Sequence, residues 1–176
     1  MIVTESDVSE EWDSRTGWAS LADQAVRSAV AASRHAGLIE TGLTAELSVK
    51  FSCDAEVRAL NAAYRHKDRA TNVLSFPMVE PDLIGSIECA DNGEVLLGDV
   101  VLAHGVCAAE ADERGIAIGD HATHLVVHGV LHLLGYDHET GDADADAMEA
   151  VERTALAALG IADPYAERMR SYSDGR

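Results

Sequence analysis

The stretch HATHLVVHGVLHLLGYDH, residues 121–138, predicts a buried helix that carries a stripe of imidazoles. His121, His124, His128 and His132 follow one another at intervals of 3, 4 and 4, which places them along one side of a helix. Nearly every other position is apolar, so we expect the helix to be buried between its cap at Asp120 and Leu134. Polar side chains on a buried helix must be satisfied by hydrogen bonds or by an ion.

A metal site is predicted from a third histidine that follows this helix. His128 and His132, one turn apart, can present two nitrogens to one ion. Gly135 lets the chain leave the helix with a positive φ, and His138 can then complete the site. His132, Gly135 and His138 follow His128 by 4, 7 and 10 residues, and this spacing matches the HExxHxxGxxH pattern of zinc peptidases. A hydrogen-bonded role for each histidine and a competing pair, His124 with His128, are the alternatives.

Three imidazoles without a cysteine suit Zn²⁺, with Ni²⁺, Cu²⁺ or Fe²⁺ as alternatives. Three protein ligands leave one coordination position open, as in catalytic zinc sites, where bound water has a pKa near ~7. Asp137, beside His138, is expected either to orient a ligand or to cap the turn.

Gly129 argues against a peptidase, because an HExxH peptidase carries its proton-shuttling glutamate at this position. Cleavage of a phosphodiester places a different demand on the site. The leaving oxygen can be stabilised by a metal or a cation, and in RNA the 2′-hydroxyl can act as nucleophile.

A basic cluster lies in LNAAYRHKDRATNVLSFP, residues 60–77. The cluster comprises Arg65, His66, Lys67 and Arg69, between the expected end of a helix and a short strand. A guanidinium here could hold a phosphate near the metal. The alternative is that these cations lie in solvent and stabilise the helix C-terminus.

Composition predicts a soluble globular protein that is cytoplasmic, with no membrane span and no secretory leader. One domain over residues 1–165 is expected, then a loose tail, 166–176. Cys53, Cys89 and Cys107 are expected to be buried or inert thiols in a reducing compartment. With 13 basic and 31 acidic residues, the net charge of −18 argues against a broad electrostatic grip on nucleic acid.

The pattern of elements predicts an α+β fold with one small mixed sheet of about four strands and about five helices. The interval from Val79 to Gly93, with two glycines and a proline, is expected to be a loop or an irregular hairpin. The expected strands are 1–4, 43–52, 72–77 and 94–103, and the expected helices are 18–35, 54–65 (capped by Asp54, burying Tyr64), 104–114, 121–134 and one ending at Leu159.

Acidic residues crowd the start of the last helix: Glu139, Asp142, Asp144, Asp146, Glu149 and Glu152. We expect them to stabilise the positive end of the helix dipole. A second cation site is the alternative.

Four stretches of the chain resemble the YbeY family of metal-dependent bacterial endoribonucleases. They are LNAAYRHKDRATNVLSFP, LLGDVVL, HGVLHLLGYDH and MEAVERTALAALGIADPY, and together they run from about Leu60 to Tyr165. The resemblance implies a zincin-like fold and one zinc ion on His128, His132 and His138. It also implies an arginine needed for activity at Arg65, and Ser75 and Pro77 near the cleft.

The implied function is cleavage of single-stranded RNA in maturation of the 3′ end of small-subunit ribosomal RNA and in ribosome quality control. Ribosomal proteins and an Era-type GTPase are the implied partners. Lys67 and Ser75 are further candidates for substrate binding. Alternatives are a ribosome-assembly factor whose metal is mainly structural and, more remotely, a metzincin-like peptidase.

Overall fold

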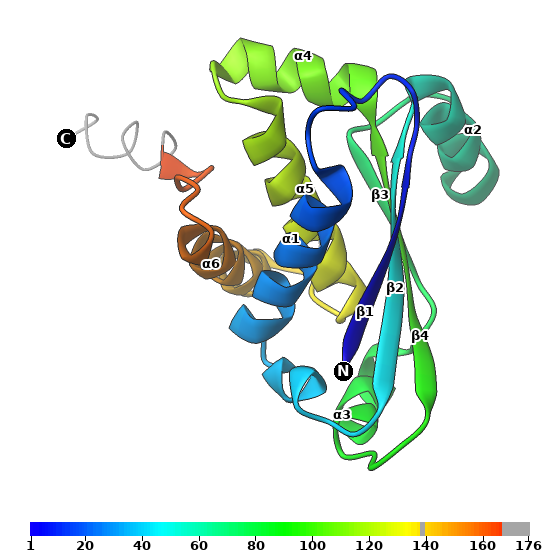
Figure 1. Ribbon diagram of the computed structural model, residues 1–176, viewed down its shortest axis with the longest axis vertical. Helices are drawn as coiled ribbons and strands as arrows, with labels where there is room; N and C mark the ends of the chain where they lie inside the picture. Colours follow the sequence, from blue (N-terminus) through cyan, green and yellow to red (C-terminus); the bar gives the residue numbers. More distant parts are fainter. Residues whose placement is uncertain (138–139, 167–176) are drawn as a thin grey trace.

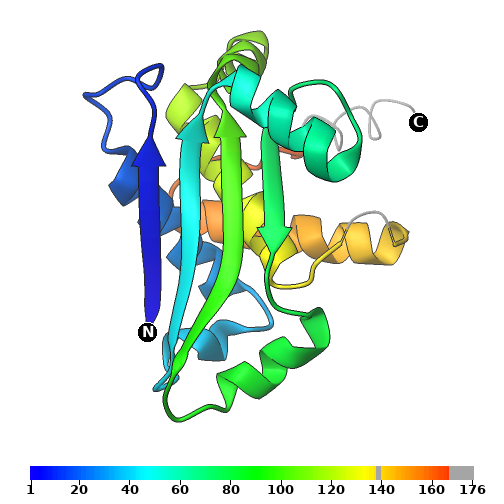
Figure 2. The same ribbon diagram turned by 90° about the vertical axis from the view of Figure 1, so that its right-hand side faces the viewer.

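The computed structural model describes residues 1–137 and 140–166. Within them, four strands form one mixed sheet with six α-helices around it (Figures 1 and 2). The elements are β1 (Ile2–Val8), α1 (Trp18–Ala32), the 3-10 helix η1 (Ala36–Ile39), β2 (Thr44–Ser52), α2 (Asp54–Arg65), β3 (Val73–Pro77), α3 (Pro81–Glu88), β4 (Glu94–Ala103), α4 (His104–Arg114), α5 (Ile118–Leu133) and α6 (Asp142–Ala158).

The sheet has the strand order β1-β2-β4-β3. β1 and β4 both run parallel to β2, whereas β3 pairs antiparallel with β4 and forms an edge. Figure 1 shows α1, α5 and α6 on one side of the sheet and α2 on the other. The predicted α+β class with a mixed four-stranded sheet is therefore confirmed.

The alternation in β2 sets which face of the sheet meets the helices. Ala45, Leu47, Val49 and Phe51 are buried, while the residues between them are half-buried. Successive side chains of a strand point to opposite faces, so this run places one apolar row under α1 and α5.

Helix α5 packs against the sheet unusually closely, and Gly129 is the reason that it can. A Cβ atom at position 129 would lie 2.7 Å from Cγ1 of Val100 on β4. From the sequence alone, the glycine at 129 is only a chemical difference from peptidases. The structure adds a packing reason for it, because α5, packed against β4, leaves no room for a side chain at this position. A side chain there would push α5 away from β4.

Several predicted elements are confirmed closely, but one predicted loop and the predicted burial of Tyr64 are wrong. The interval 79–93 is not a loop: it holds α3, with Pro81 in its first turn. Proline is compatible with the first turn of a helix because its missing N–H has no helical partner there. Tyr64, expected to be buried, is 69% exposed and contacts only the edge of Phe76 among aromatic rings of the described residues.

Helix ends also differ from expectation. α1 ends at Ala32 rather than His35, β1 continues to Val8, and α5 begins at Ile118, so Asp120 lies in its first turn instead of capping it. Asp54 does not cap its own helix: its Oδ1 accepts a bond of 3.2 Å from the backbone N–H of Val106, in the first turn of α4.

The described residues show free thiols and no helix that combines the length and apolar character needed to cross a membrane. Burial, with Glu110 and Asp54 nearby, raises the pKa of Cys107 to about 12, which makes this thiol inert at neutral pH. Cys89, expected to be buried or inert, is exposed. The expected tail, 166–176, lies outside the described residues except for Ala166.

Candidate active site

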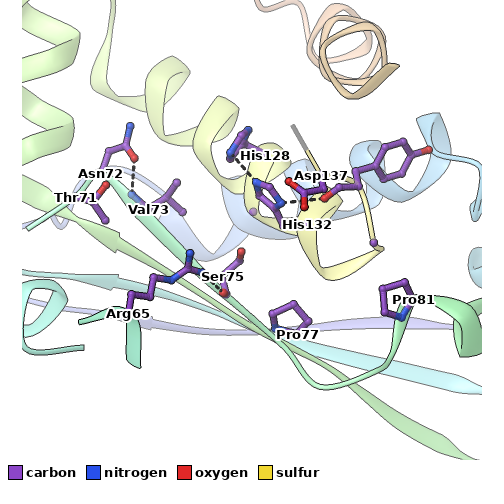
Figure 3. A pocket seen from close by; sticks show the side chains of 13 residues that line it. Arg65, Thr71, Asn72, Val73, Ser75, Pro77, Pro81, His128, His132 and Asp137 are labelled. Atoms are coloured by element: carbon purple, nitrogen blue, oxygen red, sulfur yellow. Dashed lines mark hydrogen bonds between the residues drawn. The ribbon is translucent and has the colours of Figure 1, made fainter. Parts of the chain in front are cut away.

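A cleft of about 490 Å³ lies between α5 and the edge strand β3. Figure 3 shows its two walls, with His128 and His132 on one and Arg65 and Ser75 on the other. The lining residues are Arg65, Thr71, Asn72, Val73, Ser75, Pro77, Pro81, His128, Gly129, His132, Gly135, Tyr136 and Asp137. The structure thus brings together most of the residues that the sequence singles out.

The imidazoles of His128 and His132 converge in this cleft. Their Nε2 atoms lie 3.0 Å apart, and their ring centroids are 4.6 Å apart. Each Nδ1 atom is already engaged: that of His132 lies 2.9 Å from the carbonyl oxygen of Tyr136, and that of His128 lies 2.6 Å from Oε1 of Glu152.

These contacts decide where the ring protons sit. A carbonyl oxygen and an ionised carboxylate can only accept, so both Nδ1 atoms carry the proton and donate it. In the neutral rings both Nε2 atoms then carry lone pairs that face each other across 3.0 Å. Two opposed lone pairs repel, and a cation between them removes the repulsion.

The donor set therefore fits a zinc ion. Two imidazole nitrogens about 2.0–2.1 Å from one tetrahedral ion lie about 3.3 Å apart, close to the observed separation. Within residues 1–137 and 140–166 no third His, Cys, Asp or Glu completes a group that could hold an ion. The third predicted ligand, His138, lies outside the described residues.

Glu152 of α6 is the buried anion of this site. Its side chain is 1% exposed, and its two oxygens reach His128 at 2.6 Å and His124 at 3.3 Å, while the hydroxyl of Tyr165 also donates to it. Burial alone would raise the pKa of this carboxyl, but the hydrogen bonds from His124 and His128 outweigh it and lower the pKa to about 2. Glu152 is ionised at neutral pH.

The competing pair is not supported by this geometry. The rings of His124 and His128 are 6.5 Å apart, and both turn a nitrogen towards Glu152 rather than towards a common ion. His121 lies further along the helix, where burial, with His124 and Arg114 nearby, lowers its pKa to about 4. His121 is therefore neutral at pH 7.

Arg65 forms the cationic side of the cleft. It lies at the end of α2, and its Nη2 donates a bond of 2.9 Å to the main-chain carbonyl of Ser75 on β3 (Figure 3). Within the described residues Arg65 has no carboxylate ion pair. Its charge is therefore available to an anionic ligand in the cleft.

The match to known proteins agrees with this arrangement. Residues 8–160 match the family model described as endoribonuclease YbeY. The chain belongs to the YbeY family. A protein named endoribonuclease YbeY from Rhizorhabdus wittichii is 52% identical over 166 residues, covering 94% of this chain and 98% of that protein. The one from Sphingopyxis alaskensis is 49% identical over 168 residues, covering 96% and 99%.

The fold is also similar to the solution structure of TM1509 from Thermotoga maritima. That likeness covers 100% of this chain and 97% of the other, with a TM-score of 0.55 at 20% identity. The resemblance to the YbeY family inferred from sequence motifs is confirmed by the family match, which extends it to the N-terminal part of the chain.

The other predicted residues of this YbeY-family site lie at different distances from its centre. Ser75, Pro77 and Asp137 line the cleft, and Figure 3 shows Asp137 beside His132. Lys67 does not line it. Together with Arg69 it lines an adjoining groove of about 350 Å³, which shares Arg65, Asn72 and other residues with the cleft.

Sequence reasoning missed the role of Glu152. It was assigned to an acidic run at the start of the last helix, but the structure places it deep in α6, where it is buried. A signal was present: Glu152 lies four residues after Met148 and four before Leu156, both fully buried, so it occupies the apolar stripe of its helix. Tyr165, the last residue of the expected domain, was missed as well.

Proposed function

We propose that this chain is a zinc-dependent endoribonuclease that cuts single-stranded RNA and acts in maturation of the 3′ end of small-subunit ribosomal RNA and in ribosome quality control. Membership of the YbeY family makes the chain an endoribonuclease, an enzyme that hydrolyses the phosphodiester bonds of RNA. The zinc, the single-strand preference and the ribosomal role are the proposed part.

One observation carries the metal dependence: two Nε2 atoms with opposed lone pairs, 3.0 Å apart, open onto a cleft whose other wall holds Arg65. His128 and His132 would hold the ion together with His138. A bound zinc ion would act as a Lewis acid on a phosphoryl oxygen or lower the pKa of water.

The residues of the opposite wall would bind the substrate. The fork of Arg65 can donate two parallel hydrogen bonds to a phosphate and stabilise the negative charge that grows during cleavage. Its bond to the carbonyl of Ser75 fixes the direction of the guanidinium before the RNA arrives. Lys67 and Arg69 would contact neighbouring phosphates from the adjoining groove.

The acidic composition supports a role inside a larger assembly. A net charge of −18 disfavours RNA binding overall, so binding would depend on local cations such as Arg65, Lys67 and Arg69. Ribosomal proteins and an Era-type GTPase would then deliver the RNA, as the sequence resemblance suggests. The proposed partners would supply binding energy that the acidic surface of the enzyme does not provide.

A metal analysis paired with an RNA-cleavage assay tests this function. Wild type, His132→Ala and Arg65→Ala are compared on single-stranded and duplex RNA. We expect one zinc per chain and cleavage of single strands in wild type, no zinc and no cleavage in His132→Ala, and zinc without efficient cleavage in Arg65→Ala. Full cleavage by metal-free wild type would refute the zinc dependence, and intact ribosomal RNA maturation with Arg65→Ala would favour an assembly factor.

A further inference from the structure

We infer that Glu152 is the positioning residue of the metal site: its carboxylate fixes the tautomer and the direction of the His128 ring, so that Nε2 is presented to the metal. This inference rests on the metal site in the proposed function. Glu152 is not a ligand in it, because its two oxygens face Nδ1 of His128 and Nε2 of His124.

The geometry at His128 carries the inference. The distance of 2.6 Å between Nδ1 and Oε1 is that of a short, charge-assisted hydrogen bond. This bond requires the proton on Nδ1, and it leaves the Nε2 lone pair facing the cleft. A carboxylate in this position also increases the basicity of the ring, which strengthens a metal–nitrogen bond.

The carboxylate is itself held in place by two further groups. The Tyr165 hydroxyl donates to Oε2, and Nε2 of His124 lies 3.3 Å from the same oxygen. The Tyr165 ring lies edge-on to His124, with a centroid distance of 5.8 Å, and the guanidinium of Arg153 lies over it. Oε1 is thereby directed at His128.

The charge balance favours a cation close to this carboxylate. Glu152 is 1% exposed, and in the described part of the chain its ion-pair partners are imidazoles, not Lys or Arg. A buried carboxylate is costly unless hydrogen bonds and a positive charge offset its lost hydration. A divalent ion on the far side of the His128 ring supplies such a charge.

His132 provides an internal comparison. Its Nδ1 donates to the main-chain carbonyl of Tyr136 at 2.9 Å, so the backbone sets its tautomer. A side-chain carboxylate thus sets the tautomer of His128, whereas a main-chain carbonyl sets the same tautomer in His132. Only the tautomer of His128 can be changed by substitution of a single carboxylate.

A matched control exists in the pair His35 and Glu88. The Nδ1 atom of His35 lies 2.9 Å from Oε2 of Glu88, and both side chains are largely buried. Neither residue lines the cleft. Glu88→Gln therefore removes a buried carboxylate bonded to an imidazole without touching the proposed metal site.

The test measures the zinc dissociation constant of wild type, Glu152→Gln and Glu88→Gln by competition with a chromogenic chelator. We expect Glu152→Gln to weaken zinc binding about 10- to 100-fold, as loss of such a carboxylate does in other metal sites, and Glu88→Gln to change it less than about threefold. A shift in the visible spectrum of the cobalt-loaded protein should accompany the loss in Glu152→Gln alone.

Equal zinc affinity in wild type and Glu152→Gln would refute the inference and leave the proposed function intact, whereas a wild type that binds no zinc would refute the proposed metal site itself. If Glu152→Gln does not fold, nitrogen–proton correlation spectra of zinc-loaded wild type decide the matter. The inference requires a proton on Nδ1 of His128 and none on Nε2, and a metal bound through Nδ1 would overturn it.

Discussion

The two walls of the cleft hold their functional groups in opposite ways. On the α5–α6 wall, the side chains of His128 and Glu152 are 24% and 1% exposed and are joined by one short hydrogen bond. On the α2–β3 wall, Arg65 is exposed and is anchored through a main-chain carbonyl.

This difference separates two tasks. A buried, hydrogen-bonded wall holds the His128 and His132 imidazoles rigidly, and removal of one partner leaves another group unsatisfied. An exposed cation is screened by salt and is free to meet a polyanion. Substitutions on the first wall should therefore affect metal content, and substitutions on the second should affect the substrate.

The largest effect is expected from removal of a ligand. His132→Ala should weaken zinc binding by more than about 100-fold and abolish RNA cleavage, because a ligand contributes more than the groups that orient it. Zinc content after dialysis measures this, and treatment of wild type with a chelator should reproduce the loss. His35→Ala is the control, and retention of stoichiometric zinc by His132→Ala would contradict the assignment.

Arg65→Ala should lower kcat/KM for RNA by about 100- to 1,000-fold, the usual cost of losing one donor to a developing charge. Its zinc affinity should stay at the wild-type value. Arg65→Lys should restore only part of the rate, since an ammonium lacks the planar fork. Loss of zinc from Arg65→Ala would contradict the assignment of metal binding to one wall and substrate binding to the other.

Acid should destabilise the buried wall through His121. The unfolded chain takes up a proton at this residue near pH 6.5, while the folded chain does so only near pH 4, so protons favour unfolding between these values. The metal-free protein should lose about 3 kcal/mol of unfolding free energy over this window from His121 alone. Denaturant titrations at several pH values should show that the free energy of unfolding depends less steeply on pH in His121→Gln than in wild type. Equal dependence in the two proteins would argue against His121 as the cause.

Gly129→Ala should cost about 1–3 kcal/mol of unfolding free energy, because the added Cβ would meet Val100 at 2.7 Å. The double variant Gly129→Ala with Val100→Ala should be more stable than the sum of the two single effects predicts. Thermal unfolding of all three variants measures this coupling. Strict additivity would mean that α5 does not owe its position to this contact.

The smallest effect concerns the adjoining groove. Lys67→Ala and Arg69→Ala should each reduce the slope of log K against log salt for single-stranded RNA by about 0.7. Binding measured at several salt concentrations tests this, with Arg15→Ala, an exposed arginine elsewhere, as the control. An unchanged slope in both variants would show that the adjoining groove does not contact the phosphates of the RNA.

Local sequence signals predict most of this fold. The alternation in β2, the histidine spacing on α5 and the positive φ at Gly135 depend on neighbouring residues, and the structure bears them out. The helix α3 was missed because Gly85 and Pro81 are typical of loops. Proline favours a loop inside an element, yet suits the first turn of a helix.

The candidate site is predicted only in part, because its partners are far apart in the sequence. The spacing of His128 and His132 predicts a pair of ligands, but nothing local reveals that Glu152, 24 residues after His128, contacts that histidine. The close approach of Gly129 to Val100 is likewise a tertiary contact. Such pairings become visible only when α6 and β4 are placed against α5.

The hydrogen bond from Arg65 to the main-chain carbonyl of Ser75 affects which substitutions the site can tolerate. Every residue has a main-chain carbonyl, so no substitution at position 75 can delete the acceptor that aims the guanidinium. The Ser75 hydroxyl is thus free to vary independently of Arg65. Mutational covariation between these two positions is not required, and the strand backbone preserves the direction of the charge through evolutionary change.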